Sequence, residues 1–302
     1  MNRANNSTRT QVPLHPNLPT VLTSFIGRKR EIAEILRLLT STHLVSLVGT
    51  GGCGKTRLAL RVAAELTDQY LGGVYWVELA RLADLTLVPQ VVAKALNVVE
   101  QSGTPLMDTL LDSLCDRQTL LVLDNCEHLL AACAQLVEAL AGCPNLNILA
   151  TSREPLGVIG ETLYPVLPLA LPAAHLSVDE IRQVDSVRLF VERARSILPN
   201  FSLTPDNAEI VSTICRDLDG IPLAIELASA RVSVLSVKQI QERLDRRFDL
   251  LVSTTRADER HRTLRAAIDW SYDLLSSSER LLLQRLAVFT AGFALSTAES
   301  AC

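Results

Sequence analysis

The sequence lacks the features that mark membrane, secreted and nucleic-acid-binding proteins. No apolar stretch approaches the roughly 20 residues that a membrane-spanning helix needs, and residues 1–10 are polar, without the apolar core of a secretory signal. The net charge of −4 provides no overall positive charge for a nucleic-acid backbone. We therefore expect a cytoplasmic protein that binds no membrane and makes no direct contact with nucleic acid.

The cysteines lack the spacing of a metal or redox site. No two of them are arranged as Cys-x-x-Cys, and several lie in apolar, helix-like patterns, so we expect reduced and buried thiols. The seven are Cys53, Cys115, Cys126, Cys133, Cys143, Cys215 and Cys302. Cys53 alone has a functional alternative, an oxidisable thiol beside a helix N-terminus, but a tolerated small residue is the favoured interpretation. The sequence also has no internal repeat, zinc-ligand spacing or Ser-His-Asp pattern.

A glycine-rich stretch is the strongest motif that the sequence does contain. Residues 49–56 read Gly-Thr-Gly-Gly-Cys-Gly-Lys-Thr, between an apolar run at 44–48 and a helical pattern at 57–66. This is the G-x-x-x-x-G-K-[ST] loop in its strand–loop–helix context, in which backbone N–H groups surround a phosphate. We expect Lys55 to reach the β- and γ-phosphates and the Thr56 hydroxyl to bind Mg²⁺. The alternative is a glycine-rich helix cap. The predicted nucleotide-binding residues here are Gly49, Thr50, Gly51, Gly52, Cys53, Gly54, Lys55, Thr56 and Arg57.

Two further apolar runs end in polar residues suited to the same site. Residues 119–124 form a near-continuous apolar run that ends in Asp124, as a strand buried on both faces does. Ligands of open α/β sheets bind beyond the carboxyl ends of the strands, so we expect Asp124 to hold Mg²⁺; the alternative is an aspartate that caps the next helix. A second run at 146–151 is followed by Arg153, which can contact a γ-phosphate or can be a solvated loop residue.

The order of the elements predicts an α/β domain followed by a helical one. With 302 residues, of which 48% are hydrophobic and 21% charged, the chain is long enough for two or three packed domains. Residues 1–20 are polar and then proline-rich, which is typical of a linker. Strand signals stop after residue 167, and from about residue 184 only helices are predicted. The expected strands are 44–48, 73–79, 119–124, 146–151 and 163–167. The expected helices are 29–39, 57–66, 87–96, 105–115, 126–140, 184–197, 205–218, 222–232, 237–244, 263–274 and 280–287, the last after a capping box at 276–279.

Five motifs occur together in a specific order. They are Phe-Ile-Gly-Arg at 25–28, the phosphate loop, Leu-Val-Leu-Asp-Asn at 121–125, Ala-Thr-Ser-Arg at 150–153 and Gly-Ile-Pro-Leu-Ala at 220–224. As an ordered set they resemble the NB-ARC type of STAND signalling ATPase. The chain is most similar to the ATPase modules of bacterial LuxR-type or AfsR-like large transcriptional regulators, and the resemblance runs from about residue 17 to the end.

The resemblance implies a parallel-sheet P-loop nucleotide-binding domain at 21–172, a helical domain at 173–250 and the start of a winged-helix domain at 251–302. It implies that ADP is held in a closed resting state and that exchange for ATP opens the module and permits self-association. Sensor and effector domains would lie further along a longer protein. By motif match, Phe25, Ile26, Gly27 and Arg28 would line the adenine site with Pro222, Asp124 would hold Mg²⁺, and Arg153 would sense the γ-phosphate.

One departure from the family concerns hydrolysis. Where the family often has a second acidic residue after the Mg²⁺ aspartate, this chain has Asn125, and an amide cannot act as a general base. Glu127 is a candidate substitute, so Lys55, Asp124, Arg153 and Glu127 form the candidate catalytic set, and we expect slow ATP hydrolysis that suits a switch. The main alternative is an AAA+-like motor or loader ATPase. A metabolic phosphotransferase and a DNA-binding winged helix, with an arginine-rich but acid-interleaved stretch at 243–265, are further alternatives.

Overall fold

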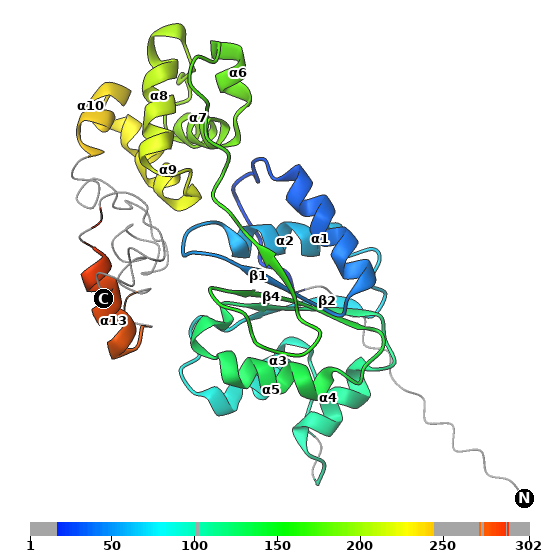
Figure 1. Ribbon diagram of the computed structural model, residues 1–302. Coiled ribbons are helices and arrows are strands. Elements are labelled where there is room, and N and C mark those ends of the chain that lie inside the picture. The colour runs from blue at the N-terminus through cyan, green and yellow to red at the C-terminus, as the bar shows by residue number, and fades with distance from the viewer. Residues whose placement is uncertain (1–16, 101–102, 245–271, 273–274, 288, 290–302) are drawn as a thin grey trace, which may run out of the picture. The chain divides into compact units, whose positions relative to one another are not determined.

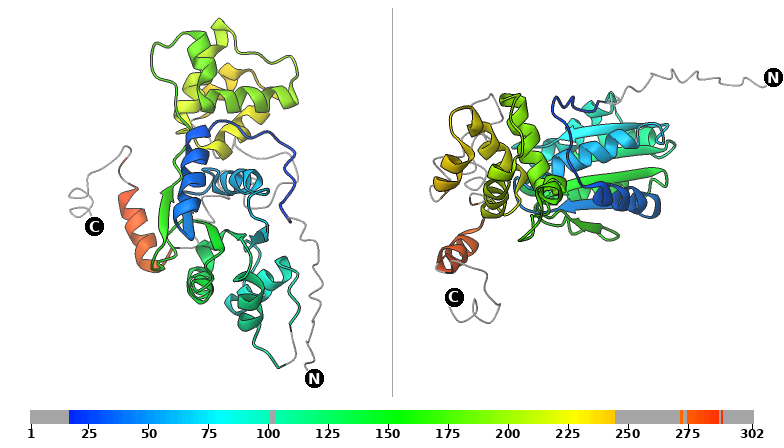
Figure 2. Two further views of the ribbon diagram at one scale, coloured as in Figure 1. Left: turned by 90° about the vertical axis from the view of Figure 1, so that its right-hand side faces the viewer. Right: turned by 90° about the horizontal axis from the view of Figure 1, so that it is seen from above.

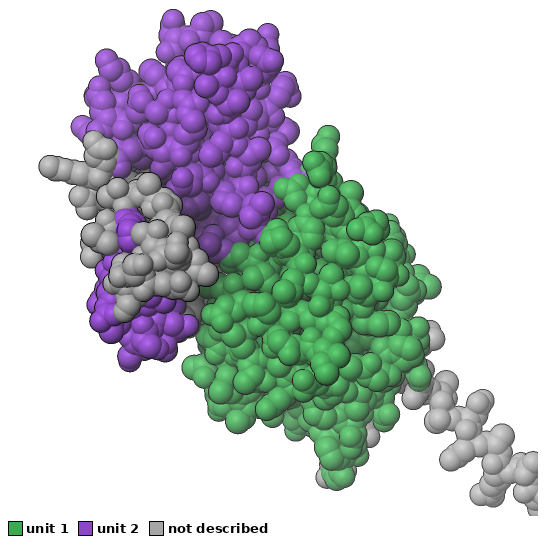
Figure 3. All heavy atoms as spheres, in the orientation of Figure 1, with its two compact units in different colours: residues 1–25, 29–49, 55–165 green, residues 26–28, 50–54, 166–302 purple. Residues whose placement is uncertain are grey.

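The computed structural model describes residues 17–100, 103–244, 272, 275–287 and 289 (Figure 1). The chain forms two compact units, coloured separately in Figure 3. The first contains residues 1–25, 29–49 and 55–165, and the second contains residues 26–28, 50–54 and 166–302. The boundaries inferred from the sequence, at residues 20, 172 and 250, stay predictions.

A five-stranded sheet forms the centre of the first unit. Its strand order is β2-β3-β4-β1-β5, and every neighbouring pair is parallel. The strands are β1 (Leu44–Val48), β2 (Gly73–Glu78), β3 (Thr119–Asp124), β4 (Leu146–Ser152) and β5 (Thr162–Pro165). All six residues of β3 are buried, which explains why this strand reads as an unbroken apolar run. The predicted parallel α/β fold is confirmed, and each expected strand is present within about two residues of its predicted ends.

Helices cover both faces of this sheet (Figures 1 and 2). They are α1 (Lys29–Ser41), α2 (Lys55–Glu65), α3 (Val88–Ala95), α4 (Leu106–Leu114) and α5 (Leu130–Leu140). Figure 1 shows α1 and α2 on one face and α3, α4 and α5 on the other. The larger core lies on the second face, where buried residues of these three helices pack against β2, β3 and β4. The helix predicted at 126–140 is divided into a 3₁₀ turn, η2 (Cys126–His128), and α5. Another 3₁₀ turn, η1 (Leu85–Leu87), precedes α3.

The prediction that all cysteines are reduced thiols is wrong for one pair. Cys115 and Cys143 form a disulfide across a sequence separation of 28 residues. Cys115 is the C-cap of α4 and Cys143 precedes β4, and the sheet brings these two segments together because β3 and β4 are neighbours. Linear spacing carries no signal for such a pairing. Cys53, Cys126, Cys133 and Cys215 are free and buried, as expected, and Cys302 lies outside the described residues.

The described part of the second unit is helical. Its helices are α6 (Val178–Gln183), α7 (Asp185–Ile197), α8 (Pro205–Asp217), α9 (Pro222–Ser229), α10 (Val237–Glu242) and α13 (Ser277–Leu286), with a 3₁₀ turn η3 (Ala230–Ser233). Phe190, at the middle of α7, is fully buried in the core of this unit. Pro205 and Pro222 each occupy the first turn of a helix, as predicted. The short α6 was not predicted, although its capping box, Ser177 with Glu180, is visible in the sequence.

Only part of the predicted C-terminal structure lies within the described residues. The capping box of Ser276 and Glu279 is present, and α13 follows it. The predicted helix at 263–274 and most of the predicted winged-helix segment at 251–302 lie outside the described residues. Within the described ranges, no helix is long and apolar enough to cross a membrane.

Candidate functional site

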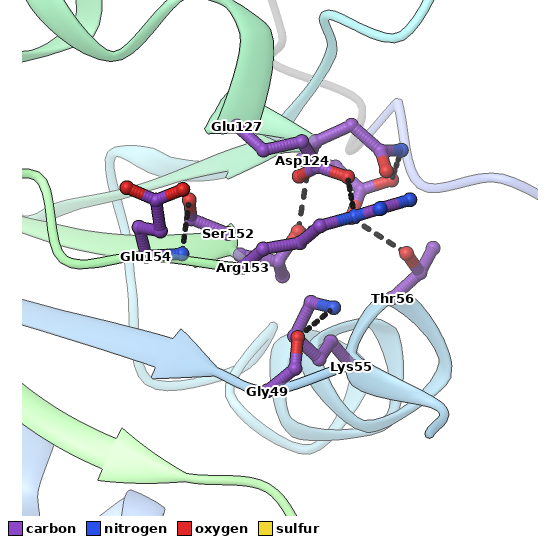
Figure 4. Close-up of polar contacts among 10 residues, drawn as sticks. Gly49, Lys55, Thr56, Asp124, Glu127, Ser152, Arg153 and Glu154 are labelled. Atoms are coloured by element: carbon purple, nitrogen blue, oxygen red, sulfur yellow. Dashed lines mark hydrogen bonds and ion pairs between the residues drawn. The ribbon is translucent and has the colours of Figure 1, made fainter. Parts of the chain in front are cut away.

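The glycine-rich loop connects β1 to α2 and has the backbone of a phosphate loop. Gly52 and Gly54 have φ values of +79° and +93°, which side chains disfavour. Lys55 begins α2, and its Nζ donates a hydrogen bond of 2.7 Å to the carbonyl of Gly49 (Figure 4). The backbone N–H of Gly49 in turn donates to Ser152 at the end of β4. The loop therefore begins at a fixed point of the sheet and ends at a helix N-terminus, where backbone N–H groups and the helix dipole favour an anion.

Residues 50–54 of this loop belong to the second unit, and contacts within that unit hold them. The N–H of Leu223 donates to the carbonyl of Gly52 over 3.2 Å. Arg28 Nη2 donates to the carbonyl of Cys53 over 2.6 Å. The ring of Pro222 lies 3.8 Å from the position that a Cβ on Gly54 would occupy. Pro222 and Arg28, both predicted to contact adenine, thus lie against the loop, although their role toward a base stays a prediction.

Residues 25–28 form a turn that is anchored on both sides. Gly27 has a φ of +70° and Arg28 a φ of +58°. The backbone N–H of Arg28 donates to Asp185, and a Cβ on Gly27 would overlap the carboxylate of Asp185. Nη2 of Arg28 also donates to the carbonyl of Leu167. Asp185 was not among the predicted site residues, because it is 157 positions from Arg28 and has no local motif.

Phe25 and Arg57, the remaining predicted binding residues at this edge, belong to the first unit. Arg57 donates from Nη1 to the Thr23 hydroxyl, and from Nη2 to the carbonyls of Thr23 and Ser24. It therefore holds the segment that leads into Phe25. Ile26, in the second unit, packs against the core of that unit.

Asp124 lies at the carboxyl end of β3 and receives hydrogen bonds from three side chains. The hydroxyls of Thr56 and Thr151 donate to its Oδ1 over 2.8 and 2.6 Å, and the amide of Asn125 donates to its Oδ2 over 3.0 Å (Figure 4). Burial raises the pKa of Asp124 to about 6, while the hydrogen bonds from Thr151 and Thr56 oppose that rise. Thr151 was not among the predicted site residues. Its place at the end of β4, next to β3 in the sheet, explains the contact.

Glu127 and Arg153 form an ion pair beside this carboxylate. Arg153 Nε lies 3.2 Å from Glu127 Oε1, and the two side chains are 17% and 6% exposed. Glu127 belongs to η2, which begins after Asn125, a residue with a left-handed φ of 65°. Arg153 directly follows β4. The structure thus brings together Lys55, Thr56, Asp124, Glu127 and Arg153, five residues that the sequence nominated from three separate segments (Figure 4).

This arrangement fits a magnesium nucleotide. Mg²⁺ prefers hard oxygen ligands and is bound by one or two protein groups together with phosphate oxygens. The Thr56 hydroxyl and the Asp124 carboxylate are such groups, and they are already adjacent at the helix N-terminus that follows the phosphate loop. The ammonium of Lys55 lies on the carbonyl of the first loop residue, from which it could supply positive charge to phosphates.

Comparison with known proteins identifies the family. Residues 27–154 match the NB-ARC domain. An uncharacterized protein of Mycobacterium tuberculosis is 43% identical over 281 residues, which cover 92% of this chain and 69% of that protein. The chain belongs to the NB-ARC family. The match begins at Gly27, within the turn at 25–28, and ends just after Arg153, so it includes the phosphate loop and the cluster around Asp124.

Two further proteins are similar to this chain in sequence or in fold. A putative HTH-type transcriptional regulator of Mycobacterium tuberculosis is 46% identical over 262 residues, or 85% of this chain, which spans only 28% of that regulator. A Walker-type ATPase of Pyrococcus abyssi has the same fold, with a TM-score of 0.54 at 14% identity, covering 92% of this chain and 88% of that one. The predicted family and its regulator relatives are confirmed. P-loop NTPases bind nucleotides, typically with Mg²⁺.

Proposed function

We propose that this NB-ARC module is a signalling switch that binds ADP and ATP and hydrolyses ATP slowly. One observation carries the proposal: the end of the phosphate loop and the polar cluster around Asp124 lie together in the sheet unit. Lys55 Nζ donates to the carbonyl of Gly49, and the Thr56 hydroxyl donates to Asp124. A magnesium nucleotide on this loop would therefore be held by Lys55, Thr56 and Asp124.

Such a switch requires a difference in nucleotide-binding free energy between its two states. A ligand shifts a two-state equilibrium only through its different affinities for the two states. A shift from almost entirely closed to almost entirely open needs about 5.5 kcal/mol of differential binding. Lys55, Thr56, Asp124 and Arg153 are the residues that would distinguish ATP from ADP, because by motif match they are the ones expected to contact a third phosphate or its Mg²⁺. In a longer regulator, this shift would be transmitted to sensor and effector domains and to self-association.

The environment of Asp124 supports slow hydrolysis. Asn125, at the position where a general base is expected, uses its side-chain amide to donate to Asp124. An amide has no basic site for the proton of an attacking water. Glu127, the other acidic candidate, forms an ion pair with Arg153. The AAA+-like motor or loader alternative requires an efficient base. It would be favoured by a steady-state turnover near that of ordinary enzymes, about 10 per second.

The decisive experiment asks which nucleotide the protein holds. The protein is purified without added nucleotide and then denatured, and the released small molecules are identified by mass spectrometry. We expect ADP in near-stoichiometric amount. Recovery of no nucleotide, together with no binding of added ADP or ATP, would contradict the proposal.

A matched pair of lysine variants assigns the binding to the loop. Lys55 is 8% exposed, and Lys55→Ala removes the ammonium that donates to the carbonyl of Gly49. We expect loss of tight ADP and ATP binding with an unchanged circular dichroism spectrum. Lys94→Ala removes the same charge from an exposed position on α3 and should bind both nucleotides normally. Unchanged ADP affinity of Lys55→Ala would refute the site assignment.

A further inference from the structure

We propose that Glu127 is a positioning residue that holds the Arg153 guanidinium and thereby sets the preference of this module between ATP and ADP. This inference rests on the proposed function, because it concerns the same nucleotide site. It assigns Glu127 a role as a counter-charge rather than as the base that activates water.

The ion pair between Glu127 and Arg153 is largely buried. The Glu127 side chain is only 6% exposed, and its Oε1 accepts a hydrogen bond of 3.2 Å from Arg153 Nε. An isolated carboxylate at such a depth would be strongly destabilising, and breaking a buried pair costs much more than the pair itself contributes. Arg153 is therefore the cation that compensates the burial of the Glu127 carboxylate.

The two carboxylate oxygens of Glu127 differ in their partners. Oε2 of Glu127 is buried and has no hydrogen-bond partner within the described part of the chain. A carboxylate oxygen can accept two or more hydrogen bonds. A side chain held chiefly to bind structural donors would normally have both oxygens satisfied. Because Oε2 has no such partner, the guanidinium of Arg153 is the principal partner of the Glu127 carboxylate. How well the buried carboxylate is compensated therefore depends on where Arg153 lies.

Backbone and side-chain hydrogen bonds hold the segments that carry Glu127 and Arg153. Glu127 lies in η2, where the N–H of Leu129 donates to Cys126 and Nε2 of His128 lies 3.0 Å from the carbonyl oxygen of Leu82. Arg153 follows Ser152, whose carbonyl accepts the N–H of Gly49 at the start of the phosphate loop. The ion pair consequently links the turn after β3 to the strand that anchors the phosphate loop (Figure 4).

These contacts define what Glu127 does in the switch. The Glu127 carboxylate already occupies Nε of Arg153, so an anionic third phosphate would have to compete with Glu127 for the same guanidinium. The favourable interaction of Arg153 with a third phosphate is therefore reduced by the interaction with Glu127 that Arg153 gives up. ADP has no such phosphate, so its affinity does not depend on the pair. Glu127 thus lowers the affinity for ATP selectively and favours the ADP-bound state.

The test compares nucleotide affinities of Glu127→Gln with those of the wild-type protein. The substitution preserves the shape of the side chain and removes its charge. We expect ATP affinity, measured in the presence of Mg²⁺ with a non-hydrolysable analogue, to rise about fivefold or more, while ADP affinity changes less than about twofold. Glu154→Gln is the matched control, since it neutralises a nearby exposed carboxylate and should alter neither affinity. Equal changes for both nucleotides, or a decrease for ATP, would overturn the proposal.

A variant cycle in the nucleotide-free protein provides a readout that needs no ligand. Arg153→Gln leaves the Glu127 carboxylate buried without its cation and should lower the unfolding temperature. Adding Glu127→Gln to that variant should recover part of the loss. Additive effects of the two substitutions would overturn the pairing.

Two further outcomes separate this inference from its alternatives. If Glu127→Gln abolishes ATP hydrolysis but leaves the ratio of ATP to ADP affinity unchanged, Glu127 is a general base and the positioning role is wrong. If the wild-type protein binds neither nucleotide, the proposed switch function fails, whereas the unfolding cycle still decides whether the two side chains are coupled.

Discussion

At the scale of single residues, Asp124 combines two conflicting requirements. It is 2% exposed, which disfavours its charged form, yet it must be charged to bind a divalent cation. Hydrogen bonds from Thr56, Thr151 and Asn125 compensate in part, but burial dominates and raises the pKa of Asp124 to about 6. A bound Mg²⁺ would replace the missing counter-charge. The ionised form of Asp124 is therefore suited to binding a cation, and it does not stabilise the metal-free protein.

The raised pKa predicts a specific pH dependence of stability in the metal-free protein. The folded state binds the Asp124 proton more tightly than the unfolded state, so this contribution is complete below about pH 4 and is lost as pH rises through about 6. A rise of about two pKa units corresponds to about 3 kcal/mol. We expect urea unfolding to show that the free energy of unfolding of the wild-type protein falls as pH rises across this range. Asp124→Asn should lack this fall. The same pH profile in wild type and variant would show that Asp124 does not titrate in this range.

At the scale of elements, the connection between α8 and α9 depends on one glycine. Gly220 has a φ of +67°, and its N–H donates to Cys215 while its carbonyl accepts the N–H of Leu169. A Cβ at Gly220 would collide with the carbonyl oxygen of Leu169. This backbone geometry directs the chain into Ile221, Pro222 and Leu223, the residues that contact the phosphate loop within the second unit.

We predict that Gly220→Ala destabilises the helical unit by about 1–3 kcal/mol, because it combines an unfavourable φ with a steric clash. Denaturant unfolding followed by circular dichroism measures this loss. Gly142→Ala is the matched control: Gly142 has no positive φ, and a Cβ there has nothing within 4 Å. We expect its stability to stay within about 0.5 kcal/mol of wild type. Equal effects of the two substitutions would mean that the α8–α9 connection does not require glycine.

At the scale of the whole molecule, the two compact units are the elements that a nucleotide switch would rearrange. Each has its own hydrophobic core, one around the sheet and one around α7 and α8. Separate cores allow two units to move as rigid bodies, which is the usual basis of domain rearrangement around a ligand. The phosphate loop contributes residues to both units.

We predict that ADP and a non-hydrolysable ATP analogue give different sedimentation coefficients. The ATP-bound form should be more expanded or more self-associated, because in the proposed switch the third phosphate would favour the open state. Arg153→Ala should bind both nucleotides but lose the difference between them. Identical sedimentation of the wild-type protein with either nucleotide would contradict the switch, even if both bind.

The local sequence determined the fold class and most of the candidate site. Strands such as β3 are recognisable because a strand that is buried on both faces must be apolar throughout. The phosphate loop is recognisable because its glycines, lysine and threonine act within eight consecutive residues. Asp124 and Arg153 could be nominated because residues at the carboxyl ends of parallel strands meet at one edge of the sheet.

Only the tertiary structure decided which distant side chains act on one another. The pairing of Glu127 with Arg153, the hydrogen bond from Thr151 to Asp124, the anchoring of Arg28 by Asp185 and the disulfide between Cys115 and Cys143 all join separate segments. Such contacts have no fixed spacing along the chain, because they depend on which strands become neighbours and on how each loop turns. Sequence motifs therefore identified where phosphate would bind, whereas the fold showed which partner restrains each charged side chain.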